Sequence, residues 1–136
     1  MTDKEILFRY RLDEAEESLE DAIKMSKSDV SSRAILNRIY YAMFYLLLAL
    51  FLKSDINIKT SKLKGIISIF DKGFIKTGKI DKRYSEIIHK TFNVRQKGDY
   101  KEFIQISSED VKEYLAFAED FFVTLKRLIL NNDNDK

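Results

Sequence analysis

The chain has no cysteine and no proline, and its 136 residues include four glycines and one histidine. Without cysteine, disulfide bonds and thiolate metal sites are excluded. The sequence shows no His-Glu zinc pair, no recognisable Ser-His-Asp set and no glycine-rich phosphate loop. With few helix breakers and abundant Leu, Ile, Lys and Glu, the composition predicts an all-α protein. We expect neither a metal nor a cofactor.

A leader sequence and a membrane span are both poorly supported. Three of the first five residues are charged, with no apolar core behind them, so nothing implies secretion and we expect a cytoplasmic protein. One apolar run of fourteen residues, 39–52, contains three tyrosines and begins beside an arginine. A spanning helix needs about 20 apolar residues. We interpret the run as the central helix of a soluble bundle, with no membrane as partner.

Charge is unevenly distributed along the chain. Residues 1–30 carry five Lys or Arg against nine Asp or Glu, whereas residues 53–101 carry thirteen against five. A basic centre between acidic ends could meet an acidic partner or a phosphate backbone. A lysine-rich solvated face explains the same pattern, and both interpretations stay open.

Hydrophobic spacing predicts about five helices, over residues 3–27, 30–53, 61–72, 82–97 and 108–130. Thr2 and Ser107 are the expected capping residues of the first and last helices, and Ser28 or Asp29 that of the second. Gly98 suits a C-terminal cap of the fourth helix. Residues 73–80 are expected to be an irregular connection. We predict one helical domain over residues 1–130 and a polar, frayed tail over 131–136.

Arg38 stands just ahead of the apolar run, on the same helix stripe as Tyr41 and Tyr45. A permanent charge beside so much hydrocarbon needs a partner. We expect Arg38 to point into the core, as a buried ion pair or as a phosphate-binding group. Tyr41 could stack on nucleic-acid bases, although tyrosines at this spacing are more often core residues.

Arg95 falls on an apolar helix stripe too, and Asp99 and Tyr100 follow it. Together they could form the polar end of a nucleotide or RNA pocket. The same residues also fit helix termination, with Arg95 favourable at a C-terminus and Gly98 as the cap. His89 is the one side chain suited to proton transfer near neutral pH, but it lies about 120° round the helix from Arg95.

Four segments resemble, in order, those of small stand-alone HEPN-domain proteins: 37–45 (NRIYYAMFY), 58–60 (IKT), 74–80 (FIKTGKI) and 95–100 (RQKGDY). The second helix carries the pattern Arg-x-Tyr-Tyr-Ala-x-Phe, and the fourth segment carries Arg-x-x-x-Asp-Tyr. The likeness extends from about residue 5 to about residue 125.

The resemblance implies an up-and-down bundle, usually a homodimer, encoded beside a nucleotidyltransferase antitoxin in a toxin–antitoxin or defence pair. Active members are metal-independent RNases in which an Arg-x4–6-His motif polarises the scissile phosphate for attack by the RNA 2′-hydroxyl. Sites of two protomers meet at the dimer interface. The resemblance makes Arg95, Asp99 and Tyr100 the catalytic candidates. Arg38, Arg95 and Tyr41 are the candidates for nucleic-acid or phosphate binding.

The chain departs from that motif at the histidine. Counted from Arg95, the histidine should fall at positions 100–102, which hold Tyr100, Lys101 and Glu102. Tyrosine titrates near pH 10 and replaces histidine poorly. Two functions are therefore the main candidates: an RNA- or nucleotide-associated HEPN protein, with RNase activity through a degenerate motif, or a non-catalytic dimeric module that regulates a nucleotidyltransferase. A third is a structural helical dimer with no nucleic acid involved.

Overall fold

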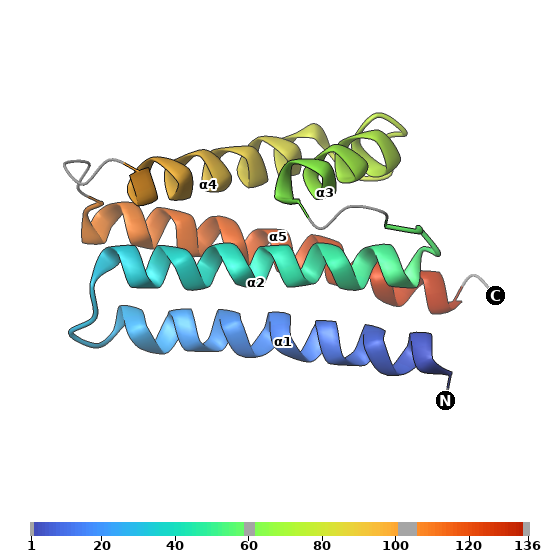
Figure 1. Ribbon diagram of the computed structural model, residues 1–136, viewed down its shortest axis with the longest axis horizontal. Coiled ribbons are helices and arrows are strands. Elements are labelled where there is room, and N and C mark those ends of the chain that lie inside the picture. Colours follow the sequence, from blue (N-terminus) through green and yellow to red (C-terminus); the bar gives the residue numbers. More distant parts are fainter. Residues whose placement is uncertain (1, 59–61, 101–105, 135–136) are drawn as a thin grey trace.

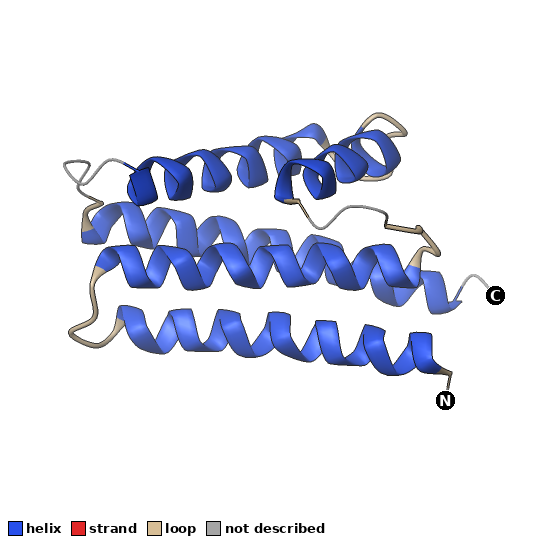
Figure 2. Ribbon diagram, in the orientation of Figure 1, coloured by secondary structure: helices blue, strands red, loops and turns tan. Residues whose placement is uncertain are grey.

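The computed structural model describes residues 2–58, 62–100 and 106–134, and the side chains of all of these except 95–100 and 132–134. The described chain is helical and contains no strand (Figure 2). Its elements are α1 (Asp3–Ser26), α2 (Ser32–Lys53), α3 (Leu63–Phe70), the π-helical turn η1 (Asp71–Ile75), α4 (Lys82–Tyr100) and α5 (Ser108–Asn134).

The four long helices alternate in direction along the sequence (Figure 1). α1 and α4 run opposite to α2 and α5, and α3 with η1 lies alongside α4. The predicted all-α, up-and-down bundle is confirmed. Because α4 is antiparallel to α2, the end of α4 and the beginning of α2 lie at the same end of the molecule.

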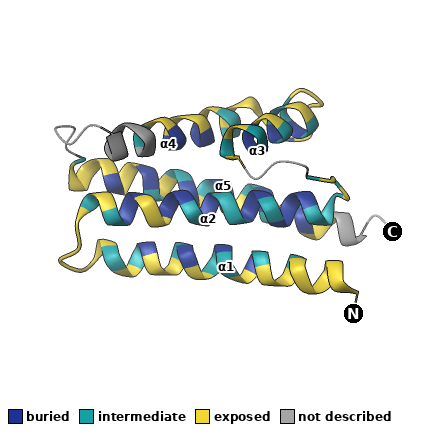
Figure 3. Cartoon of the chain, viewed as in Figure 1, coloured by how far each residue is buried: buried dark blue, intermediate teal, exposed yellow. Residues whose placement is uncertain are grey.

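α2 is the centre of the bundle and packs against α1, α3, α4 and α5. Figure 3 shows buried residues along most of its length, whereas the first two turns of α1 are mostly exposed. Ile39, Met43, Leu46, Leu47 and Leu50 are fully buried. A helix that is apolar nearly all round requires such cover on most sides.

α2 is also the only helix in the described part of the chain long and apolar enough to cross a membrane. In the bundle, 61% of its most apolar window is buried. That burial matches the predicted role of the run as a central helix.

Phenylalanines join the short elements to the core. Phe70 of α3 and Phe74 of η1 lie 6.0 Å apart between ring centroids. Phe74 stacks at 6.1 Å on Phe51 of α2, and Phe70 lies 6.0 Å from Phe121 of α5. Aromatic packing of this kind, with its large buried area, fixes α3 and η1 against the bundle.

Of the predicted N-terminal caps, two are confirmed and one is wrong. The Thr2 hydroxyl accepts from the Glu5 amide, and Ser107 and Asp110 cap each other reciprocally at the start of α5. α2, however, is capped by Ser31, which accepts from the Ala34 amide, and not by Ser28 or Asp29. The Ser28 hydroxyl instead donates to the Lys24 carbonyl, so this serine closes α1.

Three predicted helix limits are also corrected. α3 ends at Phe70, and the chain continues into η1, where the Lys76 amide donates to the Asp71 carbonyl five residues back. Residues 71–75, expected partly in an irregular connection, are thus helical, and the chain turns at Gly78 with φ of 77°. α4 continues past Gly98 to Tyr100, so Gly98 is not its cap, and α5 reaches Asn134.

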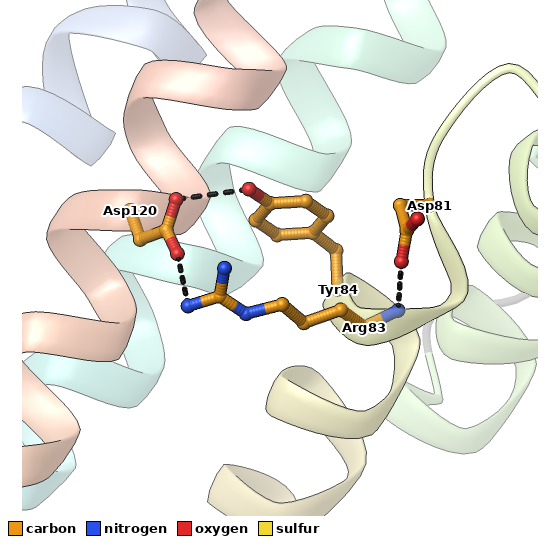
Figure 4. A network of polar contacts seen from close by, with 4 residues as sticks. All are labelled: Asp81, Arg83, Tyr84 and Asp120. Carbon is orange, nitrogen blue, oxygen red and sulfur yellow. Dashed lines mark hydrogen bonds and ion pairs between the residues drawn. The ribbon is translucent and has the colours of Figure 1, made fainter.

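The start of α4 is held against α5 by a small polar network (Figure 4). Asp81 caps α4 by accepting from the Arg83 amide at 2.8 Å. The Tyr84 hydroxyl donates to Asp120 Oδ1 at 2.9 Å, and the Arg83 guanidinium pairs with Asp120 Oδ2 at 2.7 Å. One carboxylate of α5 therefore accepts from two consecutive residues of α4.

Removing core side chains should cost far more stability than removing exposed ones of the same type. Leu125 is fully buried in α5, whereas Leu130 on the same helix is 59% exposed. We expect Leu125→Ala to lower the free energy of unfolding by roughly 2–5 kcal/mol. Leu130→Ala should change it by less than about 0.5 kcal/mol. Urea denaturation of both variants measures this, and equal losses would contradict the packing described.

The contact between Tyr84 and Asp120 should appear as an energetic coupling. We expect Tyr84→Phe to cost about 0.5–1.5 kcal/mol in the native background, because a part-buried hydrogen bond is lost. In an Asp120→Ala background the same substitution should cost clearly less. A double-mutant cycle by chemical denaturation gives both values, and identical costs in the two backgrounds would show that the contact contributes nothing.

Candidate functional site

Arg38 lies on the surface of the bundle. Its side chain is exposed, and no carboxylate within the described residues pairs with it. The prediction that Arg38 points into the core is therefore wrong. Arg33 and Asn37 are exposed too, whereas Ile35, Leu36 and Ile39 of the same helix are buried. The charge remains hydrated because Arg38 lies on the side of α2 that the neighbouring helices leave uncovered.

Aromatic rings follow Arg38 along the same side of α2. Tyr41 and Tyr45 are half-buried and stack with centroids 6.0 Å apart, and Tyr40 meets Tyr41 edge-on at 5.2 Å. Tyr40 itself is buried, as expected of a core residue. Tyr41 and Tyr45 lie at the border between core and solvent, where each side chain is partly exposed.

α1 adds a second arginine to this border. The Arg11 guanidinium lies 6.0 Å from the centre of the Tyr45 ring and 5.7 Å from that of the exposed Tyr10 ring. It also pairs with Glu14 at 2.8 Å. We call Arg11, Arg38, Tyr41 and Tyr45 the arginine–tyrosine surface. Burial, and next the Glu14 charge, raises the pKa of Tyr45 above its ordinary value, so its hydroxyl keeps its proton at neutral pH.

A concave region lies between α3, η1 and α4. It is an open cleft of about 510 Å³ with the buried side chains Ile67 and Phe92 in its lining. Lys64, Lys72 and Lys76 line it from α3, from η1 and from the residue after η1. We call it the lysine cleft.

Asp71 and His89 meet in the lysine cleft. His89 Nε2 lies 2.7 Å from Asp71 Oδ2, and the Ser85 hydroxyl donates to Asp71 Oδ1 at 2.7 Å. The serine therefore bonds to the aspartate and not to the histidine, which differs from a nucleophilic triad. Asp71 holds the imidazole, whose side chain remains 48% exposed.

The remaining predicted residues lie at the end of α4. Tyr84, Ile88 and Thr91 precede Arg95 on one stripe of α4. They are half-buried or buried, so the predicted apolar stripe is confirmed for these three residues. The side chains of Arg95, Asp99 and Tyr100 lie outside the part of the chain that the structure describes. Both backbone and side chain lie outside it for Lys59, Thr60, Lys101 and Glu102. The backbone places the end of α4 at the same end of the bundle as the start of α2 (Figure 1).

Several residues of these two regions were not predicted from the sequence. The basic excess of residues 53–101 was a signal for the lysine cleft, but no spacing rule links Asp71 to Ser85 and His89. Arg11 gave no signal because it lies in an acidic helix. Among the residues that the structure describes, no group of three or more His, Asp or Glu side chains is arranged to hold a metal ion.

Comparison with known proteins identifies the family. The sequence profile of the HEPN domain matches residues 8–128. A UPF0332 protein of Thermotoga maritima is 36% identical over 129 residues, which cover 95% of this chain and 96% of that protein.

Two proteins of Methanocaldococcus jannaschii, each named "Putative toxin", are similar as well. One is 36% identical over 91% of this chain and 86% of its own length. The other is 34% identical over 80% of this chain and 78% of its own length. The protein whose bundle is described above belongs to the HEPN domain family.

Proposed function

We propose that this protein is an RNA-associated HEPN protein with a toxin-like role in a toxin–antitoxin or defence pair. The observation that carries the proposal is an exposed arginine, free of any described carboxylate, beside stacked tyrosines on a HEPN bundle. The names of the two Methanocaldococcus relatives support the toxin-like role.

The arginine–tyrosine surface has the chemistry for single-stranded RNA. A guanidinium binds phosphate with several donors at once, and aromatic faces stack on unpaired bases. Arg38 supplies the first and Tyr41 the second, four-fifths of a helix turn apart on α2. Because Arg38 is hydrated and has no described ion pair to break, phosphate binding need not disrupt the fold.

RNA cleavage is the stronger form of this proposal. Arg95 would bind and polarise the scissile phosphate, Asp99 would orient that arginine, and Tyr100 would donate a hydrogen bond to it. These roles follow the family pattern, in which the RNA 2′-hydroxyl attacks and no metal takes part. Proton transfer needs a group that gains and loses a proton. His89, held by Asp71 in the lysine cleft, is occupied elsewhere.

The absent histidine after Arg95 favours a second candidate function. The protein would then be a non-catalytic dimeric module that binds and regulates a nucleotidyltransferase partner. RNA binding without cleavage, or binding of the partner alone, is the outcome that distinguishes this candidate.

A second copy of the chain is the partner that the uncovered aromatic side of α2 fits. Phe44 and Leu48 are only half-buried, and Tyr10 of α1 is 57% exposed on the same side of the bundle. Aromatic residues are enriched at the centres of protein interfaces. In a symmetric dimer formed through these residues, the two arginine–tyrosine surfaces would lie next to each other at the border of the interface.

RNA binding and cleavage should depend on both arginines. With EDTA present, we expect cleavage of single-stranded RNA by the native protein and none by Arg95→Ala. Arg38→Ala should weaken RNA binding about tenfold. It should also make the RNA affinity less dependent on salt concentration, by the amount expected for about one lost phosphate contact. Cleavage on gels and fluorescence anisotropy at several salt concentrations measure these effects.

Arg33→Ala is the matched control, since Arg33 is exposed on α2 about 140° round the helix from Arg38. It should bind and cleave RNA like the native protein, and all variants should keep the native helical circular dichroism. Binding without cleavage by the native protein would select the regulatory module. An equal loss of RNA binding in Arg33→Ala and Arg38→Ala would reject the assigned surface.

Dimerisation should be sensitive to charge on one side of the bundle only. We expect Tyr10→Asp to shift the protein from dimer to monomer, because the new carboxylate would be buried in the interface. Val123→Asp is the control, since Val123 of α5 is 52% exposed, close to the 57% of Tyr10. Analytical ultracentrifugation measures both. A monomeric native protein, or equal dissociation by the two variants, would contradict the assigned interface.

A further inference from the structure

We propose that the lysine cleft is a phosphate-monoester site, which would receive the terminal phosphate of an RNA strand or the phosphate of a free nucleotide. The part of this inference that concerns RNA ends rests on the proposed function, because it assumes that the protein binds RNA. It concerns a place distinct from the arginine–tyrosine surface, on another side of the bundle.

Unpaired cations converge on this cleft. Lys64, Lys72 and Lys76 all line it, and none of them pairs with a carboxylate of the described residues. By contrast, Lys90 and Lys126 elsewhere on the surface pair with Glu113 and Glu16. Three lysines with no acidic partner in one concavity create a positive potential that attracts an anion.

The one carboxylate of the cleft is already engaged. Both oxygens of Asp71 have partners, Ser85 on one side and His89 on the other. Because a carboxylate oxygen accepts, His89 Nε2 carries the proton of that contact. The other ring nitrogen, Nδ1, makes no hydrogen bond with any described residue, and Asn93 also lines the cleft. Asp71 is thus a positioning residue that orients a histidine for a ligand.

The backbone at the cleft is itself unusual. The π-helical turn η1 carries Asp71 and Lys72 and ends beside Lys76, whose amide donates to the Asp71 carbonyl at 2.9 Å. π-helical turns are rare and are often found at functional sites. The wider turn brings the aspartate and the two lysines to the same side, opposite His89 of α4.

Shape and charge select the class of ligand. A cleft of about 510 Å³ has the size of a small-molecule site, whereas a strand bound along its length needs an extended groove. A phosphate monoester carries nearly two negative charges at neutral pH, and an internal phosphodiester carries one. Three lysines therefore favour the monoester, while Ile67 and Phe92 offer an apolar lining to an attached base or ribose.

The test compares RNA ends on a protein with and without the cleft lysines. The probes are one short single-stranded RNA with 5′-phosphate, 3′-phosphate or hydroxyl ends, together with adenosine monophosphate and inorganic phosphate. We expect the native protein to bind at least one phosphorylated RNA about tenfold more tightly than the hydroxyl form. The double variant K72Q/K76Q should lose this preference and bind the hydroxyl RNA as the native protein does.

The matched control is K24Q/K112Q, which removes the same charge from two exposed lysines of α1 and α5 away from the cleft. It should keep the preference. Equal binding of all RNA ends by the native protein would overturn the cleft inference and leave the proposed function intact. Binding of the nucleotide or phosphate, lost in K72Q/K76Q, without any RNA binding would support the cleft and reject the proposed function. Equal losses in the two double variants would overturn the inference.

Discussion

The burial of α2 is the constraint on which the rest of the structure depends. Residues 39–52 of this helix are apolar on nearly every side, so exposing them to water would cost free energy. The other helices therefore pack around α2 through their apolar stripes: α1, α3, α4 and α5. Charged residues lie on the outer sides of these helices, and the two candidate sites lie at the border between the apolar core and the solvent.

Both candidate sites consist of cations at the margin of the core. Arg38 is exposed on α2 between the buried residues Leu36 and Ile39, and the lysine cleft opens where α3 gives way to η1. In each place, charge is kept in water while apolar or aromatic side chains remain within reach. That combination suits a ligand with phosphate groups and flat rings, because each part of the ligand finds a matching partner.

Much of the fold could be predicted from the sequence, because helix periodicity and local caps depend on near neighbours. Thr2 and Ser107 cap residues three positions away, and such pairs are visible in the sequence. The direction of Arg38 could not be predicted, since it depends on which side of α2 the other helices cover. Nor could the cleft, because Asp71 meets Ser85 and His89 only after η1 and α4 have packed together. Helix spacing and the family resemblance both pointed to Arg95.

The most direct test of RNA association is a map of the RNA on the protein by nuclear magnetic resonance. Amide shifts of the isotopically labelled native protein would be followed during titration with a short single-stranded RNA. The account predicts changes concentrated around residues 38–45 of α2, residues 62–76 and residues 89–93 of α4. Changes confined to the acidic outer side of α1 and to α5, or none at saturating RNA, would contradict it.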